Sequence, residues 1–303
     1  MISGATMNIY PLDLNFQDTP QTIAAYLVVG PAGPVLVETG PASTLETLKE
    51  RLTEHGYRPA DIRHVLVTHI HLDHAGAAGW WARQGADVCV HHIGAQHLVN
   101  PSRLLSSAKR IYGDAMGRLW GETLPAPAER VHTLQDGDKI EVGGLTFVAL
   151  DTPGHARHHL VYRLGEVAFT GDAAAVRLPG SPSISLPAPP PEFDREAWQR
   201  TIARLLEQDF ATIYPTHFGP LNNVREHLET LARLIDQAAE FVRCRMQDGL
   251  ERAALANAYL AWVRKHAYSQ GLSEREIQGY ETVNPTLMSV DGIMRYWRKR
   301  TEA

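Results

Sequence analysis

Four side chains of types that commonly bind metal ions lie within six consecutive positions of the chain. They are His69, His71, Asp73 and His74, and they closely follow the apolar run at 65–67. In an extended segment after a strand, alternate side chains point to the same side, so His69 and His71 can reach one metal ion together. Asp73 and His74 fall where the chain should turn into a helix, and we expect them to face a neighbouring position. The spacing is too regular for histidines scattered over a surface loop and predicts a metal site.

Three further candidate ligands follow predicted strands later in the chain. His155 follows the strand predicted at 145–150, Asp172 follows the strand at 167–170, and His217 follows the last predicted strand. Because strand ends meet along one rim of a sheet, loops from separate parts of a chain can combine their side chains there. We therefore expect one site that contains all seven residues.

In their order and context these residues resemble the pattern of the metallo-β-lactamase superfamily, as does the stretch Glu38-Thr39-Gly40. The resemblance covers residues 23–219. It implies a four-layer αββα sandwich, an α/β fold with the site between the edges of two sheets. It also implies two metal ions, with three ligands each and one bridging carboxylate. The first set is His69, His71 and His155, the second is Asp73, His74 and His217, and Asp172 bridges them.

The chemistry of these side chains suits two divalent metal ions. Imidazole and carboxylate ligands favour zinc here, with iron or manganese as alternatives. Two ions roughly 3.5–4 Å apart can share a hydroxide at neutral pH, and this metal-bridging hydroxide would be the nucleophile. Asp73 is the candidate catalytic residue because its carboxylate could hand a proton to the leaving group. Glu38 stands where the superfamily motif usually has aspartate, and we expect it to support metal ligands through hydrogen bonds.

Other histidines are not assigned to the metals. His158 and His159 come soon after a predicted ligand, but seven positions already fill two sites. We therefore expect these two to support the ligands or to lie on the surface. Three more show no paired spacing and are predicted to be cap or surface residues: His91, His92 and His97.

Strand and helix patterns alternate through the first two thirds of the chain. The segments 24–29 and 35–37 predict a hairpin around a turn of glycine and proline. Leucines at helical spacing predict a helix at 43–54. Closely spaced strands between 133 and 170 predict a second sheet. This pattern predicts an α/β fold with helices packed on shared sheets.

Two helical regions interrupt or follow this pattern. We predict a catalytic domain at 1–222, an inserted helical cap at about 93–128, and a helical C-terminal annex at 223–303. Within the cap, Leu98 and Ile111 are among the candidate buried positions.

The cap and a proline-rich segment are the candidate substrate-binding elements. In the cap, Lys109, Arg110 and Tyr112 could contact an anionic part of the substrate, although a solvated helix face is the alternative for each of them. The segment 179–191 is rich in proline and has no periodicity, so we expect a surface loop that lines the substrate entrance.

Composition narrows the classes of partner. The net charge of -5 disfavours nucleic-acid binding, because phosphate contacts require an excess of lysine and arginine. No run approaches membrane-spanning length and the N-terminus lacks a signal-like pattern, which predicts a cytoplasmic protein with a small-molecule substrate and no membrane partner. Cys89 and Cys244 fit buried free thiols better than a disulfide. The oligomeric state stays open, a homodimer included.

Within the superfamily, the chain most resembles glyoxalase II-like hydrolases and lactamase-like proteins with a helical C-terminal annex. This resemblance implies metal-dependent hydrolysis of an ester, thioester or lactone of a small metabolite. No C-terminal basic cluster matches the glutathione-binding residues of glyoxalase II. Two alternatives share the fold: a mononuclear iron persulfide dioxygenase, and a phosphodiesterase or nuclease.

Overall fold

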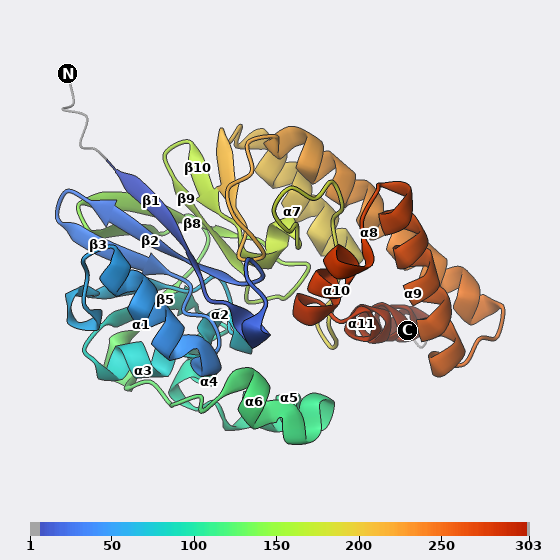
Figure 1. Cartoon of the computed structure of the whole chain (residues 1–303), viewed down its shortest axis with the longest axis horizontal. Coiled ribbons are helices and arrows are strands. Elements are labelled where there is room, and N and C mark those ends of the chain that lie inside the picture. Colours follow the sequence, from blue (N-terminus) through green and yellow to red (C-terminus); the bar gives the residue numbers. More distant parts are fainter. Residues whose placement is uncertain (1–6, 302–303) are drawn as a thin grey trace.

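The computed structural model describes residues 7–301 and shows two β-sheets packed face to face (Figure 1). The first sheet has the spatial order β1-β2-β3-β4-β5-β6, and the second has the order β11-β10-β9-β8-β7. The strands of the first sheet are Asn8–Asp13, Ala24–Gly30, Gly33–Val37, His64–Leu66, Asp87–His91 and Val131–Leu134. The strands β7 to β11 are Lys139–Val142, Leu145–Asp151, Leu160–Leu164, Val167–Phe169 and Thr212–Tyr214.

Strand pairing confirms most of the predicted sheet pattern. The predicted hairpin is present, because β2 pairs antiparallel with β3. From β3 to β6 each strand pairs parallel with the next, as strand and helix alternation requires. Two points differ. The sequence pattern does not predict β1, and Thr133 and Leu134, expected in the second sheet, belong to β6 of the first. The chain returning from the cap pairs with β5, and this pairing decides the sheet to which β6 belongs.

The two faces of each sheet bury different side chains because successive residues of a strand point to opposite sides. In β3, Leu36 packs with the helices outside the first sheet, while Val35 and Val37 pack between the two sheets. In β9, Val161 packs toward the helices outside the second sheet and Tyr162 packs between the sheets. The resulting order of layers is the αββα sandwich predicted from the resemblance.

Helices cover the outer faces of both sheets. Those that pack on the first sheet include α1 (Leu45–Glu54), which follows β3, and α3 (Ala78–Arg83), which lies between β4 and β5 in the sequence. The helices α7 (Arg195–Glu207) and α8 (Val224–Gln247) cover the second sheet through Trp198, Ile202 and the buried face of α8. The short helix α2 (Leu72–Ala75) lies at the end of β4.

The predicted cap consists of short helices that lie beside the ends of the strands (Figure 1). They are α4 (Ala95–Val99), α5 (Ser102–Tyr112) and α6 (Met116–Trp120). Leu98 is buried as predicted, but Ile111 is 48% exposed. The prediction that Ile111 is buried is wrong because this side chain lines a cavity and is not packed into a core.

The C-terminal region is helical, as predicted. After α8 it contains α9 (Arg252–Ser269), α10 (Glu274–Val283) and α11 (Thr286–Thr301). The helices α8, α9 and α11 pack on one another and share a hydrophobic cluster with the second sheet. Among the described residues, no helix combines the length and the apolar character needed to cross a membrane. Both cysteines are free thiols, with Cys89 buried and Cys244 half-buried.

Candidate metal centre

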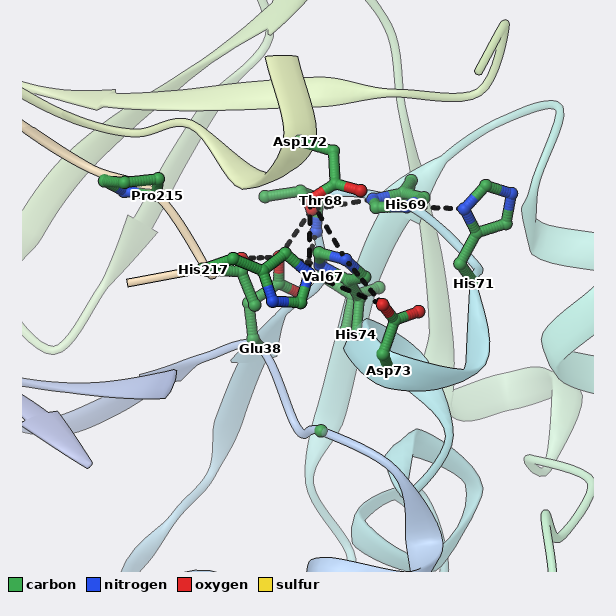
Figure 2. Close-up of polar contacts among 12 residues, drawn as sticks. Glu38, Val67, Thr68, His69, His71, Asp73, His74, Asp172, Pro215 and His217 are labelled. Atoms are coloured by element: carbon green, nitrogen blue, oxygen red, sulfur yellow. Dashed lines mark hydrogen bonds and ion pairs between the residues drawn. The ribbon is translucent and has the colours of Figure 1, made fainter. Parts of the chain in front are cut away.

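The seven predicted ligands lie together where four strands end. His69, His71, Asp73 and His74 follow β4, and the last two lie on the helix α2. The other three follow β8, β10 and β11: His155, Asp172 and His217. Figure 2 shows His71 on one side of the group and His217 on the other, with Asp172 between them. Three groups drawn from these residues have ligand atoms within 4.8 Å of one another, close enough to share an ion.

The first group consists of three histidines whose ring nitrogens converge. Nδ1 of His71 lies 3.0 Å from Nε2 of His69 and 2.9 Å from Nε2 of His155. The rings of His69 and His155 are 0% and 2% exposed. Nitrogen atoms this close in a buried site have the arrangement of a three-histidine metal site.

The second group contains Asp73, His74 and His217. Oδ2 of Asp73 lies 3.6 Å from Nε2 of His74 and 3.4 Å from Nε2 of His217. The side chain of Asp73 is 19% exposed and lines a cavity, whereas both histidines are buried. This group can hold a second ion and leaves one carboxylate at the solvent side.

Asp172 lies between the two groups and directs one oxygen to each. Its Oδ2 is 3.3 Å from Nε2 of His155 in the first group. Its Oδ1 is 3.4 Å from Nε2 of His74 and 3.4 Å from Nε2 of His217 in the second. A carboxylate in this position can bridge two cations.

Four ligand histidines use the second ring nitrogen for a hydrogen bond outside the site. The contacts are His69 Nδ1 with Thr68 Oγ1 at 3.0 Å, His74 Nδ1 with Glu38 Oε1 at 3.1 Å, His155 Nδ1 with the Pro187 carbonyl at 2.7 Å, and His217 Nδ1 with the Thr22 carbonyl at 2.9 Å. Such contacts fix the ring orientation and leave Nε2 free for a metal. The geometry is what metal-binding histidines require.

Glu38 organises the hydrogen bonds beneath the site. Its Oε1 accepts from the hydroxyl of Thr68 at 2.5 Å and from the hydroxyl of Thr216 at 3.1 Å, in addition to its contact with His74. Glu38 is 1% exposed and has a φ of 65°, a left-handed conformation that is uncommon for a residue with a side chain. Glu38 therefore contacts a candidate ligand, His74, as expected for a residue that supports the site through hydrogen bonds.

Two glycines allow the loops to place the ligands that follow them. Gly154, before His155, has a φ of 142°, and a Cβ there would collide with Trp198. Gly171, before Asp172, has a φ of 48°, and a Cβ there would collide with the side chain of Thr68. Glycine is the residue that adopts both conformations without a side-chain clash.

Burial and neighbouring charges shift the pKa values of the candidate ligands in different directions. Burial lowers the pKa of His69 and lowers that of His71 to about 3, so both rings are neutral and can donate a lone pair. Burial also opposes the charged form of His74, but Asp73 and Asp172 reverse this effect and raise its pKa well above the usual value. Burial raises the pKa of Asp172, but His74 and His155 outweigh it and hold that pKa well below the usual range. A site that attracts protons in this way also attracts metal cations.

Two buried polar atoms in the site have no hydrogen-bond partner among the described residues. They are Nε2 of His74 and Oδ1 of Asp172, which face each other across 3.4 Å. A buried polar atom without a partner is destabilising, so such atoms usually mark an ion or water site. Together with the donor set, they show that these residues fit a divalent metal ion.

The structure gives His159 a role that the sequence left undecided. His159 is fully buried, and its Nε2 accepts a hydrogen bond from the backbone N–H of Asp172 at 3.1 Å. Its Nδ1 lies 2.9 Å from the hydroxyl of Thr152. His159 therefore holds the loop of the bridging aspartate. His158 is also buried and contacts Glu192 at 3.5 Å.

A cavity of about 300 Å³ lies over the metal centre between the cap, the proline-rich segment and the C-terminal helices. Tyr112 lines it, as do Arg103 and Arg157, which are not among the predicted substrate contacts. Lys109 and Arg110 are exposed and lie outside its walls. The residues of α5 that line the cavity recur at helical spacing, so Arg103 and Tyr112 lie on one face of the helix. Lys109 and Arg110 lie outside that face. Pro187 and other prolines of 179–191 line the cavity, but the segment is not the expected surface loop, because Leu186 and Ala188 are buried.

A model of the metallo-beta-lactamase superfamily matches residues 18–217. The chain belongs to this superfamily. The match covers all seven candidate ligands and Glu38, and it ends at His217.

Individual members of the superfamily are distant relatives. The chain is 23% identical over 218 residues to the metallo-beta-lactamase fold-containing protein ST1585 of Sulfurisphaera tokodaii, covering 70% of this chain and 79% of that one. It is 23% identical over 299 residues to a Bacillus subtilis protein named probable metallo-hydrolase YqjP, covering 92% of both. The metallo-beta-lactamase family protein TTHA1429 of Thermus thermophilus superposes with a TM-score of 0.69 at 23% identity, over 97% of this chain and 94% of that one. This structural likeness shows the fold and extends over the C-terminal helices.

Proposed function

We propose that this protein is a dinuclear metal-dependent hydrolase that cleaves an ester, thioester or lactone bond of a small metabolite. The observation that carries the proposal is the position of Asp172, whose two oxygens face different groups of ligands. A mononuclear site would leave Asp73, His74 and His217 gathered in a buried cluster without a cation. The two donor sets therefore favour two metal ions.

The candidate ligands divide into two sets, one for each metal ion. His69, His71 and His155 would hold one ion, while Asp73, His74 and His217 would hold the other with Asp172 between them. This set favours zinc, with iron or manganese as alternatives. Divalent metals at such a site lower the pKa of water and polarise the oxygen of a carbonyl group.

Asp73 is the residue best placed to move a proton. Its carboxylate is the most exposed among the ligands of the second group and borders the cavity where a substrate would lie. Oδ2 of Asp73 lies 3.4 Å from Nε2 of His217, and this contact orients the carboxylate. From this position Asp73 can accept a proton and deliver it to the leaving oxygen or sulfur.

The walls of the cavity favour a substrate with an apolar part. Ile93 and Ile111 are 39% and 48% exposed and both line the cavity, where a bound apolar group would cover them. Tyr112 extends across the cavity and its hydroxyl lies 3.1 Å from Sδ of Met288 on α11. We therefore retain Tyr112 as a substrate contact, whereas Lys109 and Arg110 could reach only a part of the substrate outside the cavity.

The test is hydrolysis by protein reconstituted with zinc, manganese or iron, under anaerobic conditions. The substrates are matched esters, thioesters and lactones with apolar acyl groups, together with a phosphodiester and a persulfide. We expect metal-dependent cleavage of a carbonyl substrate that needs no oxygen. Oxygen consumption on the persulfide with one iron per chain would contradict the proposal, as would cleavage of the phosphodiester alone.

A pair of matched variants distinguishes the loss of a metal ligand from a general loss of folded protein. His71→Ala removes a ligand nitrogen and should abolish turnover while the far-ultraviolet circular dichroism stays unchanged. His92→Ala removes an exposed imidazole that lies outside the cavity walls and should leave turnover at the wild-type value.

A further inference from the structure

A second cavity, of about 200 Å³, lies within the C-terminal helices and contains none of the candidate metal ligands. Its walls come from all four helices α8 to α11 and from the segment 182–186. The volume is many times that needed for one water molecule. It is therefore large enough for a small organic molecule.

Aromatic rings form one wall of this annex cavity. Trp262 and Tyr259 on α9 line it with ring centroids 5.4 Å apart, and Trp262 also stacks on Phe241 at 5.2 Å. The aliphatic side chains of Leu234 and Ile277 line other parts of the wall. Such a wall favours the planar or aliphatic body of a ligand.

The wall also includes the side chain of Tyr259, which carries a polar hydroxyl. Tyr259 is 3% exposed, and its hydroxyl makes no hydrogen bond with any of the residues in the described part of the chain. A tyrosine hydroxyl can both donate and accept a hydrogen bond. The cavity is where a ligand atom can supply a partner.

An arginine and a histidine lie at the same cavity. Arg233 on α8 lines it and is exposed, and it has no carboxylate within ion-pair distance among residues 7–301. His266 lines it as well and lies against Trp262, with ring centroids 5.6 Å apart. The acidic residue of the wall, Glu281, is engaged by the backbone N–H of Thr286 at 3.1 Å and by its hydroxyl. An unpaired guanidinium beside an aromatic wall suits a carboxylate with an apolar body.

We propose that the annex cavity is a second binding site, separate from the metal centre, for a small carboxylate with an aromatic or aliphatic body. The carboxylate pairs with Arg233, the body packs on Trp262, and the hydroxyl of Tyr259 gains a polar partner. The wall segment 182–186 leads directly to Pro187, whose carbonyl accepts the hydrogen bond from His155 at 2.7 Å. The site therefore adjoins the loop that orients a candidate metal ligand.

Binding can be measured on the full chain without any assay of turnover. The probes are phenylacetate and hexanoate, with the uncharged phenylacetamide as the comparison, followed by calorimetry and by tryptophan fluorescence. We expect saturable binding of both carboxylates, weaker binding of the amide, and a fluorescence change that is lost in Trp262→Phe. Because the site contains no metal ligand, protein treated with a chelator should bind the carboxylates with the same affinity as protein loaded with zinc.

Substitutions at exposed positions locate the site. Arg233→Gln should weaken carboxylate binding by about tenfold, the effect of one charge-assisted hydrogen bond. Arg225→Gln is the matched control, because Arg225 lies on the same helix, is exposed and does not line the cavity. Binding that disappears on metal removal, or that Arg233→Gln and Trp262→Phe both leave unchanged, would overturn the proposal. So would the absence of saturable carboxylate binding to the folded wild-type chain.

Discussion

Oε1 of Glu38 lies 3.1 Å from Nδ1 of His74, and this contact joins a buried carboxylate to a candidate metal ligand. Glu38→Gln keeps the size of the side chain but removes its charge, so we expect zinc affinity to fall by about 10- to 100-fold. Competition with a chromogenic chelator measures the change. Glu46→Gln, which removes an exposed carboxylate from α1, is the control. Equal zinc affinities in Glu38→Gln and the wild type would show that Glu38 does not support the site.

His159 should position Asp172 through the backbone hydrogen bond between them. In His159→Leu the N–H of Asp172 is left buried without a partner, so we expect a loss of about 1–3 kcal/mol in the free energy of unfolding, together with weaker zinc binding. His159→Gln can place its amide oxygen near the position of Nε2 and should restore part of both. Denaturant titrations and chelator competition provide the two readouts. A Gln variant that is no better than the Leu variant would argue against this positioning role.

His227 should make stability depend on pH independently of the metal ligands. Its Nε2 donates to the carbonyl of Ala174 at 2.7 Å, and burial lowers its pKa from 6.5 to about 4. The unfolded chain therefore binds a proton more readily than the folded chain. The stabilising contribution is complete above the unfolded pKa and is lost as the pH falls from 6.5 toward 4.

The variant His227→Gln keeps a donor for the Ala174 carbonyl and cannot titrate. From about pH 7 to about pH 5, the wild type should lose about 2 kcal/mol more unfolding free energy than this variant. Urea titrations of chelator-treated protein at the two pH values give the comparison. Identical losses in both proteins would show that His227 is not the titrating group.

The clustering of the candidate metal ligands can be predicted from the sequence because their signals are local. Each ligand follows a strand, and His69 and His71 alternate in an extended segment, so spacing and strand ends suffice to gather them. The role of His159 was not accessible, because it depends on the packing of one loop against the next. The same holds for Ile111, whose apolar character predicts burial but whose position places it beside a cavity.

Substrate contacts depended on information that the sequence does not contain. Lys109 and Arg110 are cations near Tyr112 in the sequence, yet the turn of α5 places them outside the cavity walls and places Arg103 in those walls. The direction of Arg157 cannot be predicted from the sequence, because it lies in the loop after His155 and a cation on a loop has no periodicity that indicates its direction. The cavity walls come from segments more than a hundred residues apart, so their shape follows from tertiary packing alone.

The number of metal ions bound per chain tests the central claim most directly. Elemental analysis of zinc-loaded wild-type protein should give two ions per chain, as a bridged dinuclear site requires. His71→Ala and His217→Ala each disrupt one ligand group, and each should retain about one ion while the chain stays folded. One ion per chain in the wild type, with His217→Ala binding as much metal as the wild type, would contradict the dinuclear site.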